Sequence, residues 1–255
     1  MNLLVCFKIV PDFDKVLPSD WEDFSLRTNL FYTKKTYNVF DESALELGLS
    51  LCESSNRRAP GSATCTAVTV AQELSPAVKK HLYAVGFDRV VKIESIQTEF
   101  APRRMAGLLR EFITEGRFDL VLTGVQSGYA DTGLVPPLLA SMLGRPFVSH
   151  AETLCFYDGQ LCVVHQGDFG RLRTTLELPA VVSVGNSPAA LRAATLRAQL
   201  MAGKREVETV FPAEDFFWFK EPVFFTEKAE KDCRFFEEKD AAERLFAHLW
   251  GGGSE

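Results

Sequence analysis

The stretch GVQSGYADTGLVPP at positions 124–137, rich in glycine and small residues, could bind a ligand through its backbone alone. It follows the apolar run 120–122 and precedes a helix-like segment. Backbone N–H groups of such a loop bind phosphate and other anions, and glycines let the ligand approach closely. The loop contains no Lys or Arg and matches neither GxGxxG nor the Walker pattern. Two interpretations stay open: a site that holds an anion through its backbone, or a tight turn that binds nothing.

Polar residues at predicted helix starts form a second group of candidates. Asn38 and Asp41 stand at the start of a helix-like segment that opens near position 41. Asn and Asp are favoured at helix N-caps, where the side chain accepts a backbone N–H. Capping does not exclude contact with a ligand, so both roles stay open for these two residues. By the same argument, Asp131 is expected to cap a helix over 131–143.

Composition and motif spacing exclude several classes of function. The 255-residue chain has a net charge of −6 and a pI near 5.4, which argues against nucleic acid or an anionic membrane as a general partner. Its six cysteines show no CxxC spacing and are expected to be reduced and buried, and its four histidines show no HExxH pattern. No set of nucleophile, base and orienting residue stands out, so hydrolytic and acyl-transfer chemistry have no support.

No segment predicts export or insertion into a membrane. Met1 leads directly into the strand-like run LLVCFKIV without a basic leader. No apolar run reaches the ~18 residues of a membrane-spanning helix. We therefore expect a protein that stays in the compartment where it is made, without membrane insertion.

Strand-length apolar runs alternate with helical patterns over the first 150 residues. The expected strands cover 3–10, 65–70, 89–93 and 119–123, and the expected helices 41–53, 75–86, 101–115 and 131–143, with a loop or hairpin at 13–37 and a loop at 54–63. This alternation predicts an α/β fold with a doubly wound, mostly parallel, Rossmann-like sheet covered by helices on both faces.

Ligands bind such sheets outside the carboxyl ends of the strands. Three predicted strand ends should meet there, after Cys6, after Val70 and over 124–134. Cys6 is expected to be a core thiol whose backbone faces the site. Lys8, beside it, either touches an anion or is solvated.

The pattern changes after position 150. The segment 152–165 predicts an antiparallel hairpin with an Asp-Gly turn at 158–159, and 173–184 continues as a strand. Residues 210–233 are extended and rich in Phe, and 234–250 are helical. We expect an α/β domain over 1–208, a C-terminal arm and helix over 209–250, and a disordered tail over 251–255.

Six stretches resemble the beta subunit of electron transfer flavoproteins in their order and spacing. VCFKIVPD (5–12) resembles the family's V-x-V-K-x-V-P-D, NVFDESALELGLSL (38–51) resembles N-P-[FY]-D-E-x-A-L-E-x-A-L-x-L, and AVGFDRVVKI (84–93) resembles A-M-G-A-D-x-A. GVQSGYADTGLVPPLLASMLGRP (124–146) resembles G-[RK]-Q-A-I-D-G-D-T-A-Q-V-G-P with its following helix, and GDFGRLRTTLELPAVVSV (167–184) resembles D-G-G-x-E-x-x-x-x-x-L-P-A-V-x-T. RAATL (192–196) falls on R-Y-P-S-L. The resemblance runs from residue 1 to about 208, and more loosely to the C-terminal helix.

The resemblance implies an electron carrier rather than an enzyme in the usual sense. It implies a cytoplasmic, bacterial-type heterodimer with an alpha subunit, which exchanges electrons with a flavin dehydrogenase or another redox partner. The implied cofactor is FAD, either shared with the alpha subunit or bound in addition to the FAD of that subunit. AMP is the alternative ligand of the beta site. The implied cofactor-binding residues are Cys6, Asn38, Val39, Phe40, Asp41, Val70, Gly124, Val125, Gln126, Ser127, Gly128, Tyr129, Ala130, Asp131, Thr132, Gly133 and Leu134.

Tyr129 either stacks on an adenine or isoalloxazine ring or lies exposed. Arg192 is the best candidate for a charged contact with a flavin or a partner.

The sequence departs from the family pattern at the loop. Val125 replaces a basic residue, Leu134 a Gln and Pro136 a Gly, and the Glu of the later signature is lost around Leu172. The pair 131–132 follows the D-T pattern of electron-bifurcating members, in which the beta subunit holds a second FAD, and this slightly favours FAD over AMP. Two other functions stay open: a redox-inactive nucleotide-binding structural or regulatory protein on the same scaffold, and an adenine-nucleotide hydrolase or stress-protein type, which lacks the signature near Pro179.

Overall fold

The computed structural model describes residues 1–16, 33–95, 101–128, 132–157, 159–185, 187, 189–212 and 240–250. The chain divides into two compact units, Met1–Lys220 and Glu221–Glu255. In the second unit the described element is helix α7 (Ala241–Trp250). The expectations for most of the Phe-rich arm and for the tail 251–255 lie outside the described residues.

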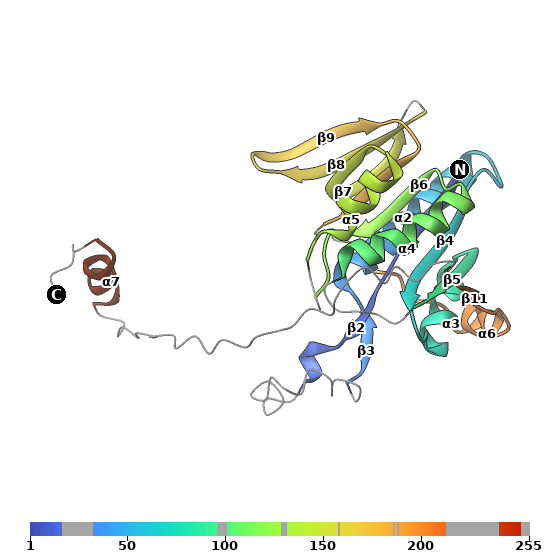
Figure 1. The fold of residues 1–255 in the computed structure, drawn as a ribbon, viewed down its shortest axis with the longest axis horizontal. Helices are drawn as coiled ribbons and strands as arrows, with labels where there is room; N and C mark the ends of the chain where they lie inside the picture. The colour runs from blue at the N-terminus through green and yellow to red at the C-terminus, as the bar shows by residue number, and fades with distance from the viewer. Residues whose placement is uncertain are drawn as a thin grey trace. The chain divides into compact units, whose positions relative to one another are not determined.

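One nine-stranded sheet organises the first unit (Figure 1). Its strands, in spatial order, are β11 (Glu208–Val210), β5 (Arg89–Glu94), β4 (Thr64–Ala71), β1 (Asn2–Cys6), β6 (Leu120–Gly124), β10 (Ala180–Val184), β7 (Phe147–Tyr157), β8 (Gln160–Gly167) and β9 (Gly170–Leu176). The pairings are parallel from β11 to β7 and antiparallel from β7 to β9. The predicted mostly parallel α/β fold with an antiparallel extension is confirmed.

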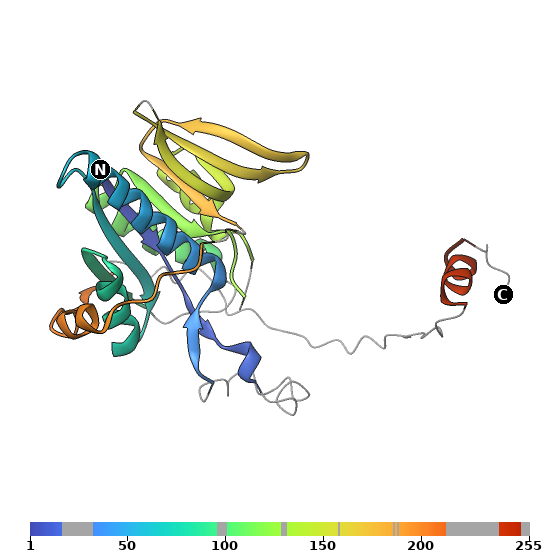
Figure 2. The same cartoon turned by 180° about the vertical axis from the view of Figure 1, so that it is seen from behind.

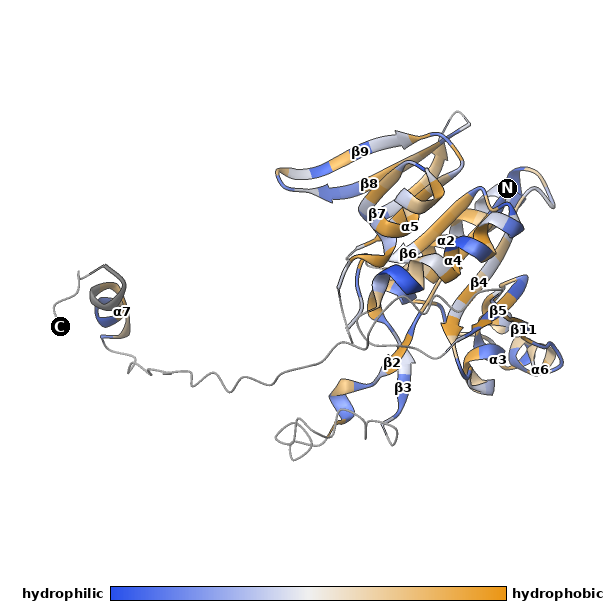
Figure 3. Ribbon diagram, in the orientation of Figure 1, coloured by the Kyte–Doolittle hydropathy of each residue, from blue (hydrophilic) through white to orange (hydrophobic). Residues whose placement is uncertain are grey.

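Helices cover both faces of the sheet because the parallel strands are buried on both sides. On β1, Leu3 and Val5 pack in one core with α2 (Val39–Arg58) and α3 (Pro76–Val85). Leu4 packs in the other core with α4 (Pro102–Gly116) and α5 (Val135–Leu143). Figures 1 and 2 show α4 and α5 on one face and α2 on the other. In Figure 3 the central strands are hydrophobic along their length, whereas β8 and β9 carry hydrophilic stretches.

A second, two-stranded sheet projects beyond the carboxyl edge of the main sheet (Figure 1). It pairs β2 (Ile9–Pro11) with β3 (Lys35–Tyr37) in antiparallel register, and the short helix η1 (Phe13–Lys15) follows β2. The predicted strand over 3–10 is therefore wrong as a single element. The apolar run leaves the main sheet after Cys6 and pairs with a different partner from position 9.

Three other predicted boundaries are also corrected. Helix α2 continues to Arg58, so the first half of the predicted loop 54–63 is helical. The predicted strand 173–184 is two strands, β9 and β10, because Pro179 between them has no N–H to donate to a ladder. The segment 131–143 begins its helix at Val135, with Leu134 rather than Asp131 at the N-cap position.

Helix α6 (Leu196–Ala202) packs against α3. Of the described cysteines, Cys155 is exposed, which corrects the expectation of buried thiols for that residue, and the other four are buried. Among the described residues, no helix is long and apolar enough to cross a membrane.

Candidate functional site

The carboxyl ends of three neighbouring strands meet where the sequence predicts a ligand site. Strand β1 lies between β4 and β6 and is parallel to both. Cys6, Val70 and Gly124 stand at or near the ends of these strands, and all three are buried. The strand order thus brings together three segments of the predicted site that lie far apart in the sequence.

The first turn of α2 closes this edge through Asp41. Its buried carboxylate accepts the backbone N–H of Lys8 through Oδ2 at 2.8 Å and that of Gly124 through Oδ1 at 2.9 Å. These two donors follow β1 and end β6, respectively. One side chain therefore ties the ends of two strands to the start of the helix.

Asn38 holds the next part of the loop. Its Nδ2 donates to the carbonyl of Gln126 at 2.8 Å, and its Oδ1 accepts the N–H of Gly128 at 3.1 Å. Asn38 occupies the N-cap position of α2, but its side chain makes no capping hydrogen bond. Asp41 lies inside the first turn. The capping role expected for both residues is therefore wrong, and both side chains instead hold segments that are distant in sequence.

Gly124 permits the close approach of helix and loop. A Cβ atom at this position would lie 2.2 Å from Asp41 Oδ1, 2.9 Å from the Cβ of Phe40 and 3.0 Å from the backbone N of Asp41. These distances are far shorter than side chains tolerate. The glycine is therefore required by the packing of α2, independently of any ligand.

Burial dominates the electrostatics of this edge. Desolvation raises the pKa of Asp41 to about 7, although the N–H groups of Lys8 and Gly124, the amide of Asn38 and the charge of Lys8 lower it. Desolvation and the nearby Asp41 carboxylate raise the pKa of the Cys6 thiol far above its usual range. Cys6 is thus a neutral core thiol, as the sequence suggests.

Much of the loop's backbone N–H capacity is already used within the chain. The amides of Gly124 and Gly128 donate to Asp41 and Asn38, and Val125 donates to the carbonyl of Val184 at 2.9 Å. The Thr132 hydroxyl accepts the amide of Leu134 at 3.4 Å. An anion would therefore need donors other than these four amides, from elsewhere in the loop or from the start of α5.

The start of α5 is itself poor in donors. Its first turn contains Pro136 and Pro137, which have no amide hydrogen. Of the first three helical positions, only Val135 carries an N–H group that could face an anion. The prolines preorganise the helix start but remove two of its N–H donors.

The remaining predicted site residues vary in their placement. Val39 is 67% exposed and Leu134 is 50% exposed. Gly133 has a left-handed backbone, with φ of 60°. Tyr129, Ala130 and Asp131 lie outside the described residues, as does the stacking expected of Tyr129.

Two residues of this edge escaped the sequence analysis. Thr123 and Ser183 are cross-strand neighbours on β6 and β10, and both are buried. Their hydroxyl groups have no hydrogen-bond partner in the structure. The available signal was a hydroxyl residue inside an apolar run, which is common in strands and therefore not decisive.

Arg192 is bound within the chain to two carboxylates of α2. Its guanidinium binds Glu46 through Nη2 at 2.6 Å and Glu53 through Nη1 at 2.5 Å, and both carboxylates belong to α2. Its backbone N–H also donates to Glu46 Oε2 at 3.1 Å. Arg192 thus fixes the segment before α6 to α2, and its expected contact with a flavin or a partner stays a prediction.

Comparison with known families bears directly on this arrangement. Residues 32–215 match the family described as the electron transfer flavoprotein domain. The chain belongs to this family. The match covers Asn38 and Asp41 of α2, the loop that begins at Gly124, and the whole antiparallel extension.

Individual relatives agree with the family match. The electron transfer flavoprotein subunit beta of Megasphaera elsdenii is 24% identical over 215 residues, covering 81% of this chain and 77% of that protein. The subunit beta of Mycobacterium leprae (strain TN) is 26% identical, covering 84% and 80%. YgcR of Escherichia coli (strain K12), whose name assigns it provisionally as an electron transfer flavoprotein subunit, is 27% identical, covering 81% and 80%. At these identities the chain is a divergent, beta-like member of the electron transfer flavoprotein family.

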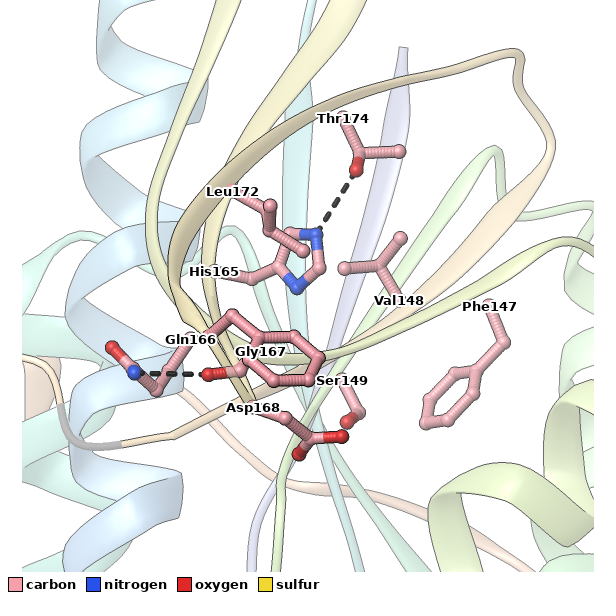
Figure 4. A pocket seen from close by; sticks show the side chains of 10 residues that line it. Phe147, Val148, Ser149, His165, Gln166, Gly167, Asp168, Leu172 and Thr174 are labelled. Carbon is pink, nitrogen blue, oxygen red and sulfur yellow. Dashed lines mark hydrogen bonds between the residues drawn. The ribbon is translucent and has the colours of Figure 1, made fainter.

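A cavity on the antiparallel extension contains one of the departures from the family pattern. It has a volume of about 430 Å³ and lies among β7, β8 and β9 (Figure 4). Within it, His165 Nε2 and Thr174 Oγ1 are 3.0 Å apart, and Leu172, near which the sequence comparison placed the lost Glu, lines the wall. Strand β10 separates this extension from β6. The cavity is therefore distinct from the loop 124–128 that Asn38 and Asp41 hold.

Proposed function

We propose that this chain is a beta-type subunit of a heterodimeric electron transfer flavoprotein and binds the adenylate part of a nucleotide at the ends of β1, β4 and β6. The proposal rests on the hydrogen bonds by which Asn38 and Asp41 hold loop 124–128, in a chain of this family. These bonds shape a small-residue loop at the edge where doubly wound sheets bind nucleotides.

The ligand we propose is FAD rather than AMP, by a narrow margin. The half-exposed Leu134 and the neighbouring Pro136 make the wall apolar, which suits a flavin ring better than solvent around AMP. Val125 argues in the other direction, because the basic residue that it replaces would stabilise a reduced flavin anion by ~1 kcal/mol at partly exposed range. The shortage of amide donors affects both ligands alike, because both contain the same adenylate phosphate.

The partners we propose are an electron transfer flavoprotein alpha subunit and, for the heterodimer, a flavin dehydrogenase or other redox protein. Relatives named as subunit beta support the first of these. Co-expression with a candidate alpha subunit, followed by affinity purification on a tag of the alpha subunit, tests the pairing. Release of the bound nucleotides and their measurement per heterodimer then identifies the ligand.

Two flavins per heterodimer are the expected result. One flavin with one AMP would support the carrier function but contradict FAD in this subunit. The loss of the basic residue at Val125, which would stabilise a reduced flavin, favours a second candidate function, a redox-inactive nucleotide-binding regulator. A colourless heterodimer without flavin absorbance would favour that candidate over the electron carrier.

A further inference from the structure

Thr123 and Ser183 form a pair of buried hydroxyl groups at the carboxyl edge of the main sheet. They are partners in the parallel register of β6 and β10, and they are 5% and 0% exposed. Neither hydroxyl group has a hydrogen-bond partner in the part of the chain that the structure describes. A buried hydroxyl group without a partner costs free energy, so two of them on paired positions require an explanation.

Both side chains point to the face of the sheet that α4 and α5 cover (Figure 1). Side chains alternate between the two faces along a strand. On β6, Val121 packs in the core beneath α4 and α5, and Leu122 packs in the opposite core. Strand β10 alternates in the same way. Thr123 and Ser183, the next residue of each strand, therefore face the side of α4 and α5.

The start of α5 and a predicted ligand contact lie on this same face. Val135, the first residue of α5, packs in this core, and Pro136 is buried. Cys6 and Thr123 each follow the last aligned pair of β1 and β6, and Cys6 packs in the same core. The hydroxyl pair therefore lies beside Cys6 and on the face that carries a helix N-terminus, where an anion is favoured.

We propose that the hydroxyl groups of Thr123 and Ser183 donate hydrogen bonds to the phosphate of the bound nucleotide. This inference rests on the proposed function, because its ligand is the adenylate phosphate.

The hydroxyl groups supply donors that the backbone of this site lacks. Four amides of the loop already donate within the chain, and the two prolines in the first turn of α5 have no N–H group. Each hydroxyl group carries one hydrogen that it can donate, and hydrogen bonds to a charged acceptor are the stronger ones. A phosphate would therefore give both hydroxyl groups the partner that they do not have within the chain.

The geometry suits one phosphate group, provided that the site opens. Neighbouring strands lie about 4.8 Å apart, so hydroxyl groups on paired positions can contact the same phosphate. Both hydroxyl groups are shielded from solvent in this structure, so a phosphate reaches them only if the groups that cover them move. Local rearrangement of this kind accompanies binding in a substantial minority of proteins.

Thr123→Val and Ser183→Ala are the test variants, because each removes a hydroxyl group with little change of shape. Thr123→Ser keeps the hydroxyl group. Thr69→Val is the matched control, since Thr69 is 2% exposed and also lies near the carboxyl end of its strand, β4. Its neighbours Val68 and Val70 both pack beneath α4 and α5, so Thr69 points to the opposite face.

The first measurement is the affinity of the full chain for AMP and for adenosine, by isothermal titration. Thr123→Val and Ser183→Ala should each weaken AMP binding about tenfold, and adenosine binding should stay unchanged because adenosine has no phosphate. Thr123→Ser and Thr69→Val should bind AMP like the unsubstituted chain. Unchanged AMP affinity in both test variants would overturn the inference while leaving the nucleotide site in place.

The second measurement is thermal unfolding without ligand, which tests whether the hydroxyl groups serve the fold instead. A hydroxyl group without a partner inside the chain contributes no hydrogen bond to stability, so Thr123→Val and Ser183→Ala should melt at or above the temperature of the unsubstituted chain. A lower melting temperature in both would show that the hydroxyl groups are bonded within the fold, and would overturn the inference.

Inorganic phosphate separates the failure of this inference from the failure of the proposed function. Absence of AMP binding to the unsubstituted chain would contradict the proposed nucleotide site. Inorganic phosphate should then still raise the melting temperature of the unsubstituted chain and of Thr69→Val more than that of Thr123→Val. An equal increase in all three would overturn the role of the hydroxyl pair as well.

Discussion

Two of the acidic residues of helix α2, Asp41 and Glu46, have pKa values that are shifted in opposite directions. Burial raises the pKa of Asp41 to about 7. Burial also raises the pKa of Glu46, but the hydrogen bonds and charge of Arg192 outweigh it and hold that pKa below its usual value. The environment of each side chain, rather than its type, therefore decides what it contributes to stability at a given pH.

For Asp41, the folded state holds a proton that the unfolded state releases. Its folded pKa of about 7 exceeds the usual value of 3.8, so its contribution to stability is present below about pH 4 and is lost as the pH rises to 7. The full difference is on the order of 4 kcal/mol. Urea unfolding at pH 5 and pH 8 should show a larger decrease with pH for the unsubstituted chain than for Asp41→Asn. Parallel decreases in the two proteins would contradict the raised pKa.

The contribution of Glu46 to stability changes with pH in the opposite direction. Its lowered pKa means that the Arg192 pair stabilises the fold above the usual pKa of 4.5 and ceases to do so as the pH falls through the folded pKa. Arg192→Ala should cost about 1–3 kcal/mol at pH 7, toward the lower end because the side chain is 34% exposed. Arg192→Lys should recover only part of the lost free energy of unfolding, since lysine lacks the planar guanidinium group that binds a carboxylate through two N–H groups. A cost that persists undiminished in chemical denaturation at pH 3 would exclude the ion pair as its source.

Gly124 and Gly128 make a matched pair of substitutions in one loop. Gly124→Ala should destabilise the protein by about 1–3 kcal/mol, because its Cβ would overlap Asp41. Gly128→Ala should be within about 0.5 kcal/mol of neutral, because nothing lies within 4 Å of the added atom. Thermal unfolding of both variants checks this. Equal costs at the two positions would show that helix and loop are not in the described contact.

At the level of elements, the sequence predicted what depends on local pattern. Apolar runs located β1, β4, β5 and β6, and the Gly86 end of α3 was visible as a C-terminal signal. Two long apolar runs each hid a change of pairing partner, after Cys6 and across Pro179, because hydrophobicity does not reveal which strand is the neighbour. The contacts of Asn38 and Asp41 with the loop span 83–90 residues, so no local pattern contains them.

The start of α5 was predictable from a signal that was overlooked. Proline is favoured in the first turn of a helix, so the pair at 136–137 indicates a start near Val135. This pair also has a functional consequence. Pro136→Ala restores an amide donor at the helix N-terminus, where an anion is favoured.

If the phosphate lies at α5, Pro136→Ala should raise the affinity for AMP by about tenfold, while the affinity for adenosine stays unchanged. Isothermal titration of both ligands measures this. Pro102→Ala, in the first turn of α4, serves as the control. An unchanged affinity for AMP would place the phosphate elsewhere.

At the scale of the whole molecule, the chain consists of two compact units with a boundary after Lys220. Strand β11 (Glu208–Val210) belongs to the main sheet, so a cut at residue 208 would remove an edge strand from the first unit. A truncation that tests the arm should therefore begin at residue 221.

We predict that removal of residues 221–255 leaves the first unit folded but abolishes co-purification with the alpha subunit, because the second unit is expected to dock there. Circular dichroism should show an unchanged melting transition for the first unit, and affinity purification on the alpha subunit should recover none of the truncated chain. Recovery at the level of the full chain would show that the first unit alone forms the interface.

The two ends of the nine-stranded sheet bear on how the protein behaves at high concentration. An outer strand with unpaired backbone groups can recruit a strand from another copy, and charged side chains on that strand oppose this. The described sheet ends at β9, which carries Arg171 and Arg173, and at β11, where Glu208 pairs with Arg89. Exposed apolar groups on the β9 side, Phe169 and Leu172, work in the opposite direction. We therefore expect the arginines of β9 to oppose strand pairing with another copy, and the apolar turn beside them to favour it.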